Sequence, residues 1–98
     1  MKELFFSWFK EHKEELLKRG IKTDLILEPT MTDNSAIYAD HISSGRMGRV
    51  TVWNSGLIDM EILDQNSGET IFYTHLEIRE TNPQINCVLK EYFDRLVL

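Results

Sequence analysis

Alternating apolar and polar positions dominate the centre of the chain, from Gly48 to Ile78. Two Asn-Ser-Gly turns, at Asn54–Gly56 and Asn66–Gly68, interrupt the alternation. Glycine supplies the left-handed backbone conformation that a three-residue hairpin loop needs, and the flanking runs are rich in Val, Ile, Thr, Phe and Tyr. The pattern therefore predicts a three-stranded antiparallel meander over residues 48–78.

The register of this meander follows if both loops have three residues, with Trp53 facing Leu57 and Gln65 facing Glu69. A slip of one residue would move every side chain to the other face, so the register that separates apolar from polar side chains is favoured. One face then carries the apolar rows Val50–Met60–Thr74, Val52–Ile58–Leu76 and Ile62–Phe72. The opposite face carries the rows Arg49–Glu61–Tyr73, Thr51–Asp59–His75 and Trp53–Leu57–Glu77.

Helical periodicity marks both ends of the chain. Residues 2–19 predict an amphipathic helix that ends before Gly20, and its apolar stripe contains Phe5, Trp8, Phe9, His12 and Leu16. Near the other end, Thr81 or Asn82 can cap a helix that has Pro83 in its first turn. The apolar stripe of this second helix contains Ile85, Val88, Leu89, Tyr92, Phe93 and Leu96.

Two more strands are expected before the meander, at 23–28 and 36–42, with a polar loop at Thr30–Ser35 between them. The order is thus helix, about five strands, helix, which predicts an α+β fold. We expect a single domain over residues 1–98, with an antiparallel sheet packed on one face by the N- and C-terminal helices. The other face of the meander would then be open to solvent.

Composition narrows the class of protein. Of the 98 residues, 42% are hydrophobic and 28% charged, which is ordinary for a globular domain. We expect a cytoplasmic protein, because no apolar run could span a membrane, the N-terminus is a poor signal peptide, and the single cysteine excludes an internal disulfide. The net charge of −5 argues against nucleic acid as a partner and suits a basic protein.

Known catalytic and metal-binding motifs are absent from the sequence, so we expect no catalytic residue, cofactor, metal or small-molecule substrate. His41 is expected at the surface and Cys87 is expected to be buried and inert. The register places His75 beside Asp59, with Glu61 nearby, and such a pair could orient a general base. A small hydrolase-like enzyme using Asp59, Glu61 and His75 therefore remains an alternative, although a nucleophile and a pocket are not evident.

The polar face of the meander is the candidate binding surface. Tyr, Trp and Arg are the residue types that dominate interface hot spots, and this face combines them with charged side chains. We expect the partner-binding residues to be Arg49, Trp53, Asp59, Glu61, Tyr73, His75 and Glu77. A solvated sheet face, or a dimer joined through this face, would be the simpler explanations.

Several segments resemble the TriTu family of bacterial immunity proteins. The matching pattern is Gly-Arg-Val-Thr-Val-Trp, a Ser-Gly turn, Glu-Ile-Leu-Asp, a Ser-Gly-Glu turn and an aromatic strand. The opening Phe-Phe-x-Trp-Phe-Lys helix also looks like that family. In the family pattern, Trp53, Gly56 and Gly68 shape the sheet and do not carry over as contact residues.

The resemblance implies a protein that is not an enzyme and that binds a cognate toxin domain, 1:1, to occlude its active site. For the namesakes of the family, the toxin is an ADP-ribosyltransferase that modifies elongation factor Tu and is carried by an Rhs effector of the type VI secretion system. A nuclease toxin of contact-dependent inhibition is the alternative target. The loop Thr30–Ser35, with Tyr38 and Asp40, matches no family pattern and is the alternative contact region.

Overall fold

The computed structural model describes residues 1–27 and 34–98, so most of the loop expected at Thr30–Ser35 lies outside the described residues. The described residues form five strands and three helices. In chain order these are α1 (Lys2–Lys18), β1 (Lys22–Leu27), β2 (Ala36–Ser43), β3 (Arg46–Trp53), β4 (Leu57–Asp64), β5 (Thr70–Glu77), α2 (Ile85–Val88) and α3 (Lys90–Leu96).

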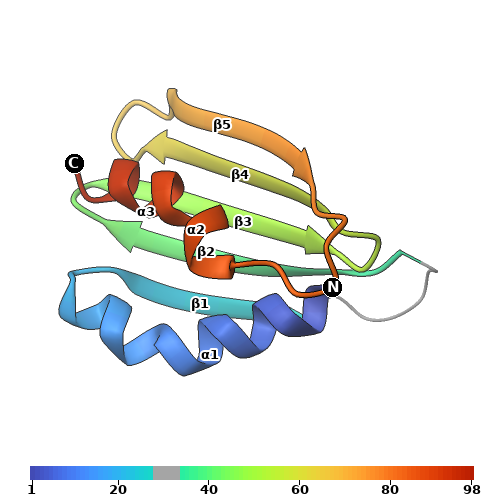
Figure 1. Cartoon of the computed structure of the whole chain (residues 1–98). Coiled ribbons are helices and arrows are strands. Elements are labelled where there is room, and N and C mark those ends of the chain that lie inside the picture. Colours follow the sequence, from blue (N-terminus) through green and yellow to red (C-terminus); the bar gives the residue numbers. More distant parts are fainter. Residues whose placement is uncertain (28–33) are drawn as a thin grey trace.

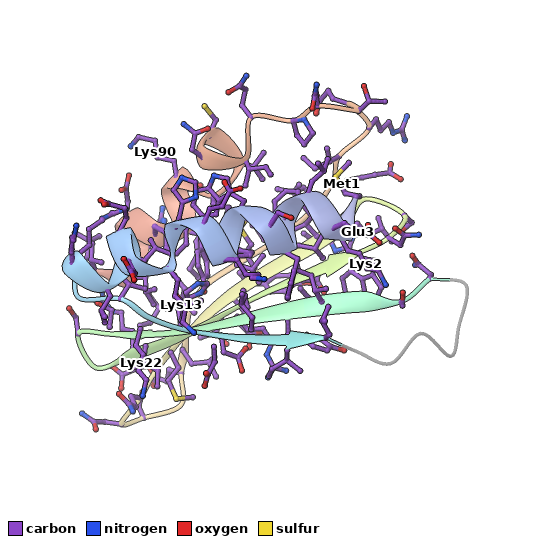
Figure 2. The ribbon with its side chains drawn as sticks, turned by 90° about the horizontal axis from the view of Figure 1, so that it is seen from below. Met1, Lys2, Glu3, Lys13, Lys22 and Lys90 are labelled. Carbon is purple, nitrogen blue, oxygen red and sulfur yellow. The ribbon has the colours of Figure 1, made fainter. Side chains whose placement is uncertain are left out.

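The strands form one antiparallel sheet in the order β1-β2-β3-β4-β5 (Figure 1). The helices all lie on the same side of this sheet, with α1 packed mainly against β1 and α3 against β3 and β4 (Figures 1 and 2). The predicted α+β architecture, with one face of the sheet covered by helices from both ends of the chain, is confirmed.

The predicted register of the meander is confirmed for most of its length. Val52 pairs with Ile58 and Ile58 with Leu76, so the apolar and polar rows fall on the two faces as expected. Gly56, which ends the first Asn-Ser-Gly turn, has φ +98°, and its carbonyl accepts a 2.8 Å hydrogen bond from the Ile78 N–H. A side chain at Gly56 would meet the Ile78 carbonyl, so this position requires glycine for two reasons.

The second turn corrects the predicted register at one end. Gln65 does not face Glu69; instead the Asp64 N–H bonds the Glu69 carbonyl at 2.8 Å, and Leu63 pairs with Thr70 across an irregularity. The cause is the Asp64 carboxylate, which accepts 2.9 Å hydrogen bonds from two backbone N–H groups inside the loop. Such an Asx turn competes with the strand ladder, and it leaves one extra residue to be absorbed as a bulge in β5.

The core lies between the sheet and the helices. Its fully buried members come from α1, four strands and the C-terminal segment, and they include Phe5, Phe9, Ile21, Ile37, Val50, Val52, Ile58, Ile62, Leu89, Tyr92 and Leu96. Gly48 of β3 sits beneath Tyr92, and a Cβ atom added at Gly48 would collide with the ring and hydroxyl of Tyr92. The missing side chain therefore lets α3 approach the sheet closely.

The C-terminal segment differs from the single capped helix that was expected. Its first helix begins at Ile85 with Gln84 as N-cap, and Leu89 separates two short helices with φ −94° and ψ −1°. Within the described residues neither helix has a side-chain cap, so Thr81 and Asn82 do not play that role. The break turns Cys87 outward, and the prediction that Cys87 is buried is wrong.

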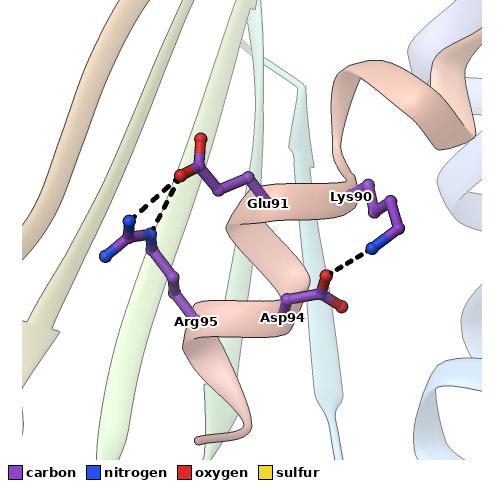
Figure 3. Close-up of polar contacts among 4 residues, drawn as sticks. All are labelled: Lys90, Glu91, Asp94 and Arg95. Carbon is purple, nitrogen blue, oxygen red and sulfur yellow. Dashed lines mark hydrogen bonds and ion pairs between the residues drawn. The ribbon is translucent and has the colours of Figure 1, made fainter.

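Ion pairs one helical turn apart support the short helix α3 on its solvent side. Lys90 contacts Asp94 at 2.7 Å, and Arg95 contacts Glu91 at 3.1 Å (Figure 3). Exposed pairs of this kind contribute about 0.3–0.5 kcal/mol each. They are small compared with the burial of Tyr92, Phe93 and Leu96, which fixes α3 on the sheet.

Candidate interaction surface

The face of the sheet opposite the helices is covered by no other described element (Figure 2). Side chains alternate between faces along each strand, so the register assigns every second residue to this open face. Two rows cross all five strands: Asp24–Asp40–Arg49–Glu61–Tyr73 and Ile26–Tyr38–Thr51–Asp59–His75. The structure thus brings Arg49, Asp59, Glu61, Tyr73 and His75 together on one surface, as predicted.

Arg49 is held rigidly at the centre of the open face. Its guanidinium donates two hydrogen bonds to the Asp40 carboxylate, at 2.6 and 2.9 Å, and lies 4.9 Å from the centroid of the Tyr38 ring. The hydrogen bond to Asp40 raises the pKa of Arg49 above its ordinary value. Bidentate and stacked arginines of this kind are preorganised for recognition. The sequence reading placed Arg49 next to Glu61, but its charged group turns toward Asp40.

Asp59 links two other predicted residues. It accepts a short hydrogen bond from His75 Nδ1, and the Tyr73 hydroxyl lies 3.5 Å from the same carboxylate oxygen. Tyr73 is 56% exposed, so its ring is available to a partner. Desolvation, then the charges of Asp59 and Glu61, raise the pKa of Tyr73, which keeps its hydroxyl protonated.

This arrangement favours binding over catalysis. The His75 imidazole is held by Asp59, but half of its surface is exposed. Thr51, the hydroxyl directly opposite Asp59, is buried at 7% exposure. The hollow found on this face is lined by other residues. Among the described residues, no group of three or more His, Cys, Asp or Glu side chains could hold a metal ion.

Trp53 and Glu77 lie at the far end of the same face. Trp53 is only half-buried, so it offers part of its ring rather than the full exposure expected for a contact residue. Glu77 pairs with Leu57 across the strands and forms a 2.8 Å ion pair with Arg79 just beyond β5. These two residues therefore border the surface that Arg49, Tyr73 and His75 occupy.

Sequence reasoning missed an apolar row at the other end of this face. Ile42, Met47 and Leu63 lie directly opposite one another on β2, β3 and β4. Beside them the surface dips into a hollow of about 370 Å³, which also touches Asp24, Asp40, Arg49 and Glu61. The missed signal was the turn Ser44-Gly45, whose positive φ angles of 53° and 74° indicate a two-residue hairpin and so align β2 with β3.

His41 is not the surface residue that was expected. It pairs with Gly48 and lies on the covered face with 1% exposure, and its Nδ1 is 2.7 Å from the Tyr92 hydroxyl. Burial lowers the pKa of His41 to about 4, against the opposing effect of the Asp40 charge. Its Nε2 has no hydrogen-bond partner among the described residues. His41 is therefore part of the core and not of the open face.

His12 lies where the periodicity placed it, at the edge of the core. Its ring stacks on Trp8 with centroids 4.1 Å apart, and its Nδ1 is 2.8 Å from the Trp8 carbonyl. In the described parts of the chain, no helix is long and apolar enough to cross a membrane.

Comparison with known proteins gives one match. The model of the family described as immunity protein TriTu matches residues 3–95, which is nearly the whole chain. No curated protein and no solved structure matches. Membership in an immunity protein family implies neutralisation of a cognate toxin by a protein that is not itself an enzyme, and this fits a fold whose polar face is suited to binding. The chain belongs to the TriTu family of immunity proteins.

Proposed function

We propose that this protein neutralises its toxin by stoichiometric binding through the open face of the sheet, in a 1:1 complex that occludes the toxin's active site. The observation that carries the proposal is the uncovered face itself, where an exposed tyrosine and a fixed arginine lie among carboxylates. Aromatic and arginine anchors surrounded by polar groups are the usual anatomy of a protein-binding patch. The helix-covered face cannot serve, because its side chains form the core.

The size of the face is adequate for tight inhibition. A stable interface buries about 800 Å² on each partner. The whole chain exposes 6136 Å², and one side of a five-stranded sheet with its neighbouring loops can supply such an area. The predicted contact residues Arg49, Asp59, Glu61, Tyr73 and His75 occupy its middle, with Trp53 and Glu77 at its border.

The proposed toxin is an ADP-ribosyltransferase that acts on elongation factor Tu and is delivered by an Rhs effector of the type VI secretion system. The support is the family resemblance of the meander and of the opening helix. Because elongation factor Tu acts in the cytoplasm, the immunity protein would act there too. The net charge of −5 would favour encounter with a basic surface of the toxin.

Titration of the toxin tests this proposal. The toxin domain encoded beside this chain's gene is assayed for transfer of ADP-ribose to elongation factor Tu, with increasing amounts of the immunity protein. Wild type should abolish transfer at one equivalent, and Tyr73→Ala should require more protein. Leu17→Ala is the matched control, because Leu17 is an exposed apolar residue (61%) on α1.

Three outcomes would contradict parts of the proposal. Inhibition at far less than one equivalent, with continuing turnover, would indicate catalysis, for which the Asp59–His75 pair is the candidate. A toxin that cuts tRNA instead of modifying elongation factor Tu would assign the protein to the nuclease toxins. Unchanged affinity of Tyr73→Ala, together with variants at Arg49 and Asp59, would place the toxin elsewhere, with the region near Tyr38 and the loop Thr30–Ser35 as the next candidate.

A further inference from the structure

The hollow in the open face is built from four neighbouring strands. Its walls come from β1, β2, β3 and β4, and its volume is about 370 Å³. Pockets that hold small ligands or anchoring side chains have volumes of roughly 300–1,000 Å³. The hollow therefore has room for more than one side chain of a partner, and it lies next to the row that contains Arg49 and Tyr73.

One side of the hollow is apolar. Ile42 and Met47 pair with each other and are 47% and 41% exposed, and Leu63 continues the row on β4. Three large apolar side chains in a contiguous row on an open surface are typical of an interaction site rather than of scattered surface residues. This row offers a seat for an apolar side chain.

The other side of the hollow has an excess of negative charge. Asp24, Asp40 and Glu61 lie in one row with a single cation, Arg49. Both hydrogen bonds of Arg49 go to Asp40, so Asp24 and Glu61 form no ion pair among the described residues. Asp24 also lies directly opposite Asp40, and like charges in that position destabilise a sheet. The unbound protein thus carries two uncompensated carboxylates at a surface hollow.

We propose that this hollow receives a basic segment of the toxin, which seats an apolar side chain on Ile42, Met47 and Leu63 and places cationic side chains against Asp24 and Glu61. This inference rests on the proposed function, because it requires the toxin to bind the open face. Charge complementarity selects the occupant: an acidic segment or a second copy of this acidic chain would add negative charge to a site that already has an excess. Closing the hollow removes water from the carboxylates, so each new ion pair becomes stronger than at an open surface.

Neutralising the two carboxylates tests the charged part of the proposal. The double variant Asp24→Asn with Glu61→Gln is compared with the double variant Glu11→Gln with Glu14→Gln, which makes the same change in net charge on the exposed side of α1. Binding to the toxin domain encoded beside this chain's gene is measured by calorimetry and by association kinetics at several salt concentrations. The hollow variant should raise Kd by about tenfold or more and flatten its salt dependence, whereas the α1 variant should change Kd by no more than about twofold.

A second pair of variants tests the apolar part. Met47→Ser is compared with Leu17→Ser, since both residues are exposed and neither substitution empties the core. Met47→Ser should raise Kd severalfold, mainly through faster dissociation, and Leu17→Ser should leave Kd unchanged. Urea denaturation of both variants checks that the fold is intact.

Double-mutant cycles identify the basic residues. Each surface Arg and Lys of the toxin is replaced by Ala and combined with Glu61→Gln or Asp24→Asn. At least one toxin cation should show coupling with each carboxylate, so that its replacement costs much less in the variant than in wild type. Losses that couple to no Arg or Lys would overturn the proposal.

The outcomes separate this inference from the proposed function. If Tyr73→Ala weakens binding while the hollow variants behave like their α1 controls, the open face binds the toxin but the hollow does not receive a basic segment. If neither Tyr73→Ala nor the hollow variants weaken binding, the open face is not the toxin-binding surface and both proposals fail. Losses in the hollow variants with coupling to toxin cations support both.

Discussion

His41 and His75 lie on strands of the same sheet but on opposite faces, and their surroundings differ accordingly. His41 is 1% exposed, hydrogen-bonded to Tyr92, and surrounded by the rings of Phe9, Tyr92 and Phe93. His75 is half-exposed and is held by Asp59. The same residue type is thus part of the core on one face and part of a polar surface on the other. We infer that substitutions on the covered face change stability and that substitutions on the open face change binding.

The largest effect is expected from Phe93→Ala on the covered face. Phe93 is 4% exposed and packs against Tyr92 and His41. Its truncation should lower the free energy of unfolding by about 3–5 kcal/mol, because it leaves a cavity in the core. Urea denaturation measures this. A loss below about 1 kcal/mol would place the ring outside the core and remove the contrast between the faces.

The next effect is a dependence of stability on pH that comes from His41. Its pKa is about 4 in the folded protein and 6.5 in the ordinary state. The unfolded chain therefore binds more protons between these values, so the stabilising contribution is complete above pH 6.5 and is lost as the pH falls toward 4. A shift of this size corresponds to about 3 kcal/mol.

Two measurements check the role of His41. Urea denaturation between pH 7 and pH 4 should show a loss of stability that is smaller in His41→Gln, and NMR titration of the imidazole should report the low pKa directly. An imidazole that titrates near 6.5 in the folded protein would mean that His41 is solvated, against its placement in the core.

A smaller loss is expected from Gly48→Ala, which adds one methyl group to the covered face. That methyl group would meet the ring of the buried Tyr92, so α3 or the strand must shift. Overpacking of this kind costs about 1–3 kcal/mol. Asn54→Ala, in an exposed loop, is a control that should change the free energy of unfolding by less than about 0.5 kcal/mol. Equal stability of Gly48→Ala and wild type would show that α3 does not approach the sheet closely.

On the open face, Tyr73→Ala should show the opposite behaviour. It should weaken toxin binding by about 1–2 kcal/mol if the ring is a hot spot. Stability should change little, because the side chain is 56% exposed and its contact with Asp59 is long, at 3.5 Å. Calorimetric titration and urea denaturation of the same sample give both numbers. A large loss of stability without a change in affinity would reverse the roles of the two faces.

The smallest effect is expected from Asp59→Asn combined with Glu61→Gln. These carboxylates should speed the encounter with a basic toxin, so their removal should mainly slow association, and most strongly at low salt. Stopped-flow association at two salt concentrations measures this. An unchanged association rate at low salt would mean that the acidic side chains of this face do not steer the toxin.

Much of the fold could be predicted from local patterns. Alternation together with the turn at Asn54–Gly56 defines the register of β3 with β4, because only one register separates the faces. Helical periodicity located the apolar stripes of α1 and of the C-terminal segment, and Gly20 ends α1 with φ +82° as expected. From the same register followed the joint position of Arg49, Glu61 and Tyr73 on one face.

The errors arose where a side chain acts on a partner outside its own element. The Asp64 carboxylate bonds the loop backbone and so shifts the end of β5, which a rule based on glycine alone does not foresee. Cys87 matched the apolar stripe, but the helix breaks at Leu89 and the residue faces solvent. His41 was taken for a surface residue because its strand alternates only weakly, and its burial depends on space left by Gly48 and filled by Tyr92.

The sequence by itself determined which residues share a face of the meander, because strand periodicity and turn chemistry are local properties that the neighbouring residues settle. Only the tertiary structure decided which carboxylate holds Arg49, which histidine is buried, and that Ile42, Met47 and Leu63 border a hollow beside Asp24 and Glu61. Those outcomes depend on contacts between segments far apart in the chain. Packing, desolvation and competition among possible ion-pair partners act only when those segments meet.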